Sequence, residues 1–182
     1  PVLYKLLMAS ALFSFTAIGA VVHFVPILTD AGAAPLAAAG IASLIGIFSI
    51  VGRIGTGLLL DRFPGHIVGA IAFMLPIIAA VLLLLVAVLP AMLVTFVGGV
   101  AAFAALDVIA FLAAKHFGLK NFGALYGALV MALSLGTAFG PLAAGSVYDH
   151  AGSYTPFLTL AIGLMATSAL PLWRLGDGPD AR

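Results

Sequence analysis

Two residues of opposite charge stand inside apolar stretches of the sequence. Arg53 precedes Asp61 by eight residues, and Asp107 precedes Lys115 by the same spacing. At a rise of 1.5 Å per residue, each charge would lie roughly 12 Å from the end of a helical segment. In hydrocarbon such a charge costs on the order of 2.5–3.5 kcal/mol even on the mildest scale, so it normally pairs inside a bundle or a water-filled cavity. We therefore expect Arg53 and Asp107 to lie at similar depth on two helices and to form a charge pair.

Both charges also have a simpler interpretation. The Arg53 side chain could snorkel to the headgroups as an anchor, and Asp107 could be a structural acid that pairs with Arg53 or stays protonated. Gly46, Ser49 and Gly57 share the helix face of Arg53, and such a stripe of small residues favours a packed or cavity-lining surface over lipid. If Asp107 is functional, it would couple proton movement to substrate transport. A substrate that competes for the Arg53 guanidinium would change how strongly the Asp107 carboxylate binds a proton.

Four further polar residues inside apolar stretches are candidates for a functional role or for packing. His23 stands three residues before Pro26 and shares a helix face with Thr16. Because proline frees a backbone carbonyl and lets a helix bend, His23 is a candidate for a gate or ligand; the alternative is an interfacial histidine without a functional role. Ser134 and Thr137 could line a path through the bundle, or could hydrogen-bond their own or a neighbouring helix.

The composition places these residues in a membrane. Of the 182 residues, 64% are hydrophobic and 7% are charged, which is too little polar surface for a soluble globule. Apolar runs of about 20 residues fit a hydrocarbon core of roughly 30 Å, and they are too long for barrel strands. The first run is also too long for a signal peptide. We predict an all-α polytopic membrane protein with six transmembrane helices, at residues 6–28, 36–60, 67–89, 91–114, 124–148 and 157–173.

The charges outside these segments are distributed unevenly. Alternate gaps and the two ends hold six of the seven Lys and Arg residues, whereas the other gaps hold Asp30 and Asp149 and no base. The positive-inside rule then predicts that both termini are cytoplasmic. We expect an integral protein of the plasma membrane, or of the inner membrane if the source is bacterial. The six bases are Lys5, Arg62, Lys115, Lys120, Arg174 and Arg182.

Small residues suggest both an internal repeat and close packing. The second segment ends in GLLLD and the fifth in GSVYD, at equivalent places in two three-helix units of opposite topology. Inverted three-helix repeats are a hallmark of major facilitator transporters. In the fifth segment, the pairs Gly123 with Gly127 and Gly136 with Gly140 predict close helix packing.

The stretch after the second apolar run contains Gly57, Leu59, Asp61, Arg62 and Gly65. These residues resemble the cytoplasmic G-x-L-x-D-R signature of major facilitator superfamily transporters in its second-half position, and over essentially its whole length the chain is similar to the C-terminal half of such a transporter. Pro64 and His66 stand where further basic residues are usual in that superfamily.

Four longer stretches carry a narrower resemblance: HFVPILTDAG, VGRIGTGLLLDR, LDVIAFLAAKHFGLKNFGALYG and GPLAAGSVYDHAGSYTPF. In order and spacing they resemble monocarboxylate transporters and their oxalate:formate antiporter relatives. In those families the corresponding helix carries a buried arginine for the substrate carboxylate, and Arg53 matches it. A guanidinium offers a carboxylate a bidentate fork and stays charged. Ser49 stands where an acid is frequent, so Asp107 is expected to replace that acid.

The resemblance implies the second half of a secondary active transporter for a small organic anion, such as a monocarboxylate, working by alternating access with proton coupling or anion exchange. Residues 1–182 would form one six-helix half-domain, with the N-terminal half missing. A second copy could take its place. The alternative is a non-transporting or regulatory six-helix membrane protein. The expected substrate-binding residues are Arg53, Ser49, His23, Ser134 and Thr137.

Other classes of function are not expected. The chain has no glutamate, no H-E-x-x-H motif and no G-x-x-x-x-G-K-[ST] loop, which argues against an enzyme. There is no cysteine, and the loop residues His66, His116 and His150 have no histidine partner at i,i+4, so neither a metal nor a cofactor is predicted. The loop bases form no stripe, which argues against nucleic-acid binding.

Overall fold

The computed structural model describes residues 2–85, 107–118, 120 and 122–174, and every regular element in these residues is a helix. Four helices are long and apolar enough to cross a membrane, at Val2–Val22, Pro35–Leu60, Gly65–Leu84 and Phe122–Ala151, and a shorter apolar stretch covers Thr155–Leu170. Residues 107–117 are helical, whereas residues 91–106 of the predicted fourth span lie outside the described residues. The all-helical class is confirmed, and the arrangement as two inverted repeats stays a prediction. The helices are α1 (Val2–Val22), α2 (Phe24–Asp30), α3 (Pro35–Leu60), α4 (Gly65–Leu85), α6 (Phe122–Ala151) and α7 (Thr155–Trp173).

The first predicted span is broken into two helices at His23. Pro26 has no backbone N–H for the carbonyl of Val22, and its ring crowds that carbonyl. The amide of Ile27 still donates to the His23 carbonyl at 2.8 Å, so the chain resumes a helix after one turn residue. Where the sequence predicts one helix over residues 6–28, the structure has two, α1 and α2, separated at His23.

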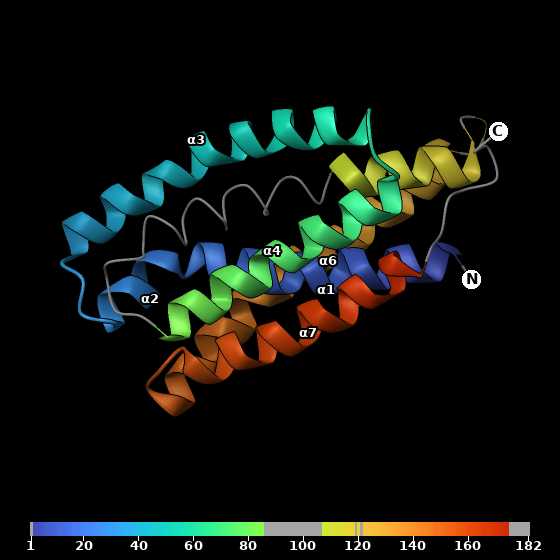
Figure 1. Cartoon of the computed structure of the whole chain (residues 1–182). Helices are drawn as coiled ribbons and strands as arrows, with labels where there is room; N and C mark the ends of the chain where they lie inside the picture. Colours follow the sequence, from blue (N-terminus) through green and yellow to red (C-terminus); the bar gives the residue numbers. More distant parts are fainter. Residues whose placement is uncertain (1, 86–106, 119, 121, 175–182) are drawn as a thin grey trace.

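Helices α1, α4, α6 and α7 pack as a bundle (Figure 1). Helix α1 packs mainly on α6, and α4 packs mainly on α7. Phe13 of α1 and Phe73 of α4 meet in the interior with ring centroids 4.7 Å apart. Leu129 of α6, Leu172 of α7 and Ile109 of the 107–117 segment join the same cluster. The core therefore ties together α1, α4, α6, α7 and the 107–117 segment, and Leu60 at the end of α3 packs against it.

Glycines let α1 and α6 approach to backbone contact. A Cβ atom on Gly136 would lie 2.5 Å from the carbonyl oxygen of Ala11, and one on Gly140 would collide with the backbone of Phe15. This pair packs as the sequence predicted. The prediction for Gly123 and Gly127 is wrong for the described residues, because a Cβ at either position meets no atom within 4 Å. Small residues permit close packing but do not create it without a facing helix.

Helix α3 lies along the outside of the bundle (Figure 1). Among the described residues its buried members are Ala38, Gly52 and Thr56, and its contacts with other helices are mainly limited ones with α2 and α4. Most of its apolar side chains are consequently exposed in this chain.

The basic residues gather at one end of the bundle. The Nζ atom of Lys5 donates to the backbone carbonyl of Arg174 at 3.3 Å, so the start of α1 and the end of α7 are level. At the start of α4, Gly65 packs against Phe111, which brings the α3–α4 turn to that end as well. The two ends of the bundle thus differ in charge, as the positive-inside pattern requires. The membrane face to which each end belongs stays a prediction.

Candidate functional site

Arg53 and Asp107 meet in the structure. The Nε atom of Arg53 lies 3.9 Å from Oδ2 of Asp107, and the two side chains are 51% and 41% exposed within this chain. At this distance the contact is an ion pair and not a direct hydrogen bond. Helix α3 positions the arginine and the 107–117 segment positions the acid, at the matching depth that their spacing predicts.

The small-residue stripe beside Arg53 forms an open surface. A Cβ at Gly46 or Gly57 would meet no atom within 4 Å. The Oγ atom of Ser49 donates to the carbonyl of Gly46 at 2.6 Å within the same helix. In the described structure the stripe packs against no helix, and Ser49 turns its hydroxyl to its own backbone.

The predicted signature residues form the tight turn between α3 and α4. The amides of Asp61 and Arg62 donate to the carbonyls of Gly57 and Leu59, each at 3.1 Å, and close the last turn of α3. Both charged side chains are exposed. Gly65 is required by packing, because a Cβ there would lie 2.6 Å from a ring carbon of Phe111.

His23 belongs to a separate cluster at the bend of the first span. Its Nε2 lies 3.1 Å from the carbonyl oxygen of Pro141, and its Nδ1 lies 3.0 Å from the hydroxyl of Tyr154. A carbonyl can only accept, so in the neutral ring Nε2 carries the hydrogen and Nδ1 accepts from the tyrosine hydroxyl. Tyr154 in turn stacks on Tyr148 with ring centroids 4.5 Å apart. His23 therefore joins the bend to α6 and to the α6–α7 connection, and not to the Arg53 pair.

Burial keeps the Tyr154 hydroxyl protonated. Desolvation raises the pKa of Tyr154 above the ordinary value of 10.0, and the neighbouring Tyr148, Asp30 and Asp149 raise it further. Because the folded-state pKa is the higher one, the unfolded chain releases this proton first as the pH rises. Tyr154 therefore makes folding less favourable at alkaline pH, above the ordinary tyrosine pKa, and remains a donor to His23 at neutral pH.

We expect His23→Ala to lower the free energy of unfolding by about 1–3 kcal/mol, because the change leaves two part-buried hydrogen-bonding groups without their partner. Heat-induced unfolding in mild detergent measures this loss. His150→Ala is the matched control, since His150 is exposed and, within the described residues, its hydrogen bond goes to the Ser146 carbonyl of its own helix. Equal melting temperatures for the two variants would show that the His23 cluster adds no stability.

The Ser134 and Thr137 hydroxyls on α6 hydrogen-bond within and between helices. The Oγ atom of Ser134 donates to the Val130 carbonyl of its own helix at 2.8 Å. The Thr137 hydroxyl lies 2.7 Å from that of Ser14, whose Oγ also donates to the Leu133 carbonyl on α6. Ser134 therefore hydrogen-bonds its own helix and Thr137 a neighbouring helix, which the sequence leaves open as the alternative to a path-lining role.

Sequence reasoning missed the partners of the candidate residues. Ser14 hydrogen-bonds Thr137, and Tyr154 hydrogen-bonds His23. Neither Ser14 nor Tyr154 stands at a spacing that marks a motif. Ser10 and Ser14 offered one signal in the sequence, since they stand at i,i+4, and polar residues on one face of an apolar helix indicate a helix–helix contact. Within the described residues, no group of three or more His, Cys, Asp or Glu side chains could hold a metal ion.

The long apolar helices, the charged end and the ion pair within two helical segments define a class of protein, a polytopic α-helical membrane protein. No protein-family model matches the chain, and no curated protein matches it.

Proposed function

We propose that this chain is half of a secondary active transporter for a small organic anion, of the major facilitator kind, with Arg53 as the anion-binding residue. The observation that carries the proposal is the exposed ion pair. Both members stand within helical segments, and the described helices leave each side chain about half exposed. In a bilayer such a pair faces protein or a water-filled cavity. A complementary six-helix half, or a second copy, would complete that cavity.

The chemistry of the pair favours a carboxylate. A guanidinium binds a carboxylate through two parallel charge-assisted hydrogen bonds, which a point-charge ammonium cannot reproduce. At 3.9 Å, Asp107 pairs with Arg53 without a direct hydrogen bond through Nε. An anion that takes the guanidinium releases the aspartate to bind a proton, which couples proton movement to anion movement.

Anion binding by the purified protein tests this proposal. A ligand that binds only the folded state at 100 times its Kd stabilises that state by about 2.7 kcal/mol. We expect lactate, pyruvate, formate or oxalate to raise the melting temperature of the native protein and to have no effect on Arg53→Gln. Arg174→Gln is the control, because this exposed residue lies at the end of α7, away from the pair. Stabilisation of Arg53→Gln as large as that of the native protein would contradict the proposal.

Asp107→Asn separates the two roles of the acid. If Asp107 carries the proton, we expect the variant to exchange labelled anion across vesicles while losing uptake driven by a pH gradient, by at least about tenfold. Exchange and gradient-driven uptake by the same vesicles provide the comparison. Gradient-driven uptake that persists at the native rate would leave Asp107 only the structural role of a charge partner for Arg53.

A further inference from the structure

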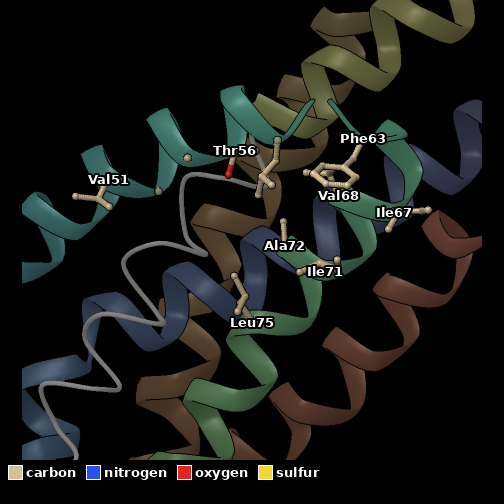
Figure 2. A pocket seen from close by; sticks show the side chains of 11 residues that line it. Val51, Thr56, Phe63, Ile67, Val68, Ile71, Ala72 and Leu75 are labelled. Carbon is tan, nitrogen blue, oxygen red and sulfur yellow. The ribbon is translucent and has the colours of Figure 1, made fainter. Parts of the chain in front are cut away.

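A groove lies between α3 and α4. Its volume is about 500 Å³, within the range of pockets that hold small molecules. Figure 2 shows the lining side chains coming from both helices and, at the connecting turn, from Phe63. Arg53 is not among the lining residues. The groove is therefore a feature that the proposed anion site does not use.

The lining is that of a site for hydrocarbon. Among the described lining residues, Thr56 supplies the single side-chain hydroxyl, and the others are glycine or carry purely apolar side chains. A site for a polar ligand presents several placed polar groups that orient it. Water or a polar solute would gain almost no hydrogen bonds here, so an apolar occupant is favoured.

The groove opens toward the lipid. Ile67 and Ile71 line it and also begin an exposed stripe on α4 that continues through Met74 and Ile78. These four side chains are 40%, 53%, 49% and 49% exposed, and they follow the helical spacing i, i+4, i+7, i+11. An entirely apolar exposed stripe on a helix that can span a membrane faces the hydrocarbon. The groove is thus accessible to acyl chains from the bilayer.

The dimensions and charge of the groove fit one leaflet. The lining runs over residues 51–59 of α3 and 67–75 of α4, or roughly 12 Å along each helix, while one leaflet contributes about half of a 30 Å core. The groove ends at the charged turn, where Arg62 is exposed beside the lining residue Phe63. A guanidinium at this level can pair with a phosphate.

We infer that the groove between α3 and α4 holds one acyl chain of a phospholipid, with the lipid phosphate beside Arg62. This inference does not rest on the proposed anion transport. The bound chain would fill the space that the sparse contacts between α3 and α4 leave, and would thereby fix α3 against the bundle.

A photoreactive phospholipid tests the inference on the native protein in lipid nanodiscs. The probe is a phosphatidylglycerol that carries a diazirine in one acyl chain, and the labelled residues are mapped on peptides by mass spectrometry. We expect labelling concentrated on residues 51–75. Gly55→Leu should lower it at least fivefold, because Gly55 lines the groove and has no atom within 4 Å of an added Cβ, so the new side chain fits and fills the groove.

Gly40→Leu is the matched control. Gly40 lies on the same helix and also has space for a side chain, but it does not line the groove. Its labelling should equal that of the native protein, whereas Arg62→Gln or a diacylglycerol probe without phosphate should label residues 51–75 more weakly. Labelling spread evenly over Ile78 and the other exposed apolar residues outside 51–75, or equal labelling of Gly55→Leu and Gly40→Leu, would overturn the acyl-chain site. Equal labelling by the two probes would overturn the role of Arg62.

Discussion

Arg53→Lys should lower anion uptake by the native protein roughly ten- to a hundredfold while membrane insertion is unchanged. Lysine keeps the positive charge but loses the planar fork that holds both carboxylate oxygens. The loss of one charge-assisted hydrogen bond corresponds to about 1.5–3 kcal/mol, and each 1.4 kcal/mol is a factor of ten. Initial rates of labelled-anion uptake, normalised to the amount of protein in the membrane, measure the effect.

The control for this substitution is Arg174→Lys, the same chemical change at an exposed residue that ends α7. Native uptake by Arg174→Lys would show that loss of an arginine fork elsewhere is harmless. Near-native uptake by Arg53→Lys would exclude Arg53 as the anion-binding residue and favour an anchor that snorkels to the headgroups.

Gly140→Leu should destabilise the bundle by at least the 1–3 kcal/mol that is typical of an overpacked core. Any side chain at this position collides with the backbone of Phe15, and backbone cannot rotate away as a side chain can. The two helices must therefore separate, which disrupts the Ser14–Thr137 hydrogen bond and the core around Phe13. Heat-induced unfolding in detergent, followed by circular dichroism, measures the loss.

Gly140→Ala gives a milder version of the same test, and Gly127→Leu on the same helix is its control. A Cβ at Gly127 meets no atom within 4 Å, and glycine is a poor helix former by about 1 kcal/mol relative to alanine. We expect Gly127→Leu to be neutral or stabilising. A melting temperature for Gly140→Ala equal to that of the native protein would show that α1 and α6 do not meet in the way described.

The sequence predicted the meeting of Arg53 and Asp107 because a helix has a fixed rise per residue. Each residue stands eight positions before a charge at the end of its segment, and the two side chains are within 3.9 Å. The helix break at His23 has a similarly local cause, since Pro26 cannot donate a backbone hydrogen bond. Helical periodicity and backbone hydrogen bonding depend on a few neighbouring residues, so their consequences can be predicted from a short stretch of sequence.

Contacts between distant helices were not predictable in this way. His23 meets Tyr154 at a separation of 131 residues, and Ser14 meets Thr137 at a separation of 123. These pairings depend on the crossing points of α1 with α6 and α7, which no local pattern specifies. For the same reason, the sequence did not distinguish the pair Gly123 and Gly127 from the pair Gly136 and Gly140. Only the second pair faces a helix in the described structure.

Counterflow in reconstituted vesicles tests the central claim most directly. Vesicles that contain the native protein are loaded with unlabelled lactate, pyruvate, formate or oxalate, and the entry of the labelled anion is followed. The proposal predicts saturable entry that is stimulated by the internal anion and is strongly reduced in Arg53→Lys. If the native protein carries none of the four anions faster than protein-free vesicles do, the assignment as a carboxylate transporter is contradicted.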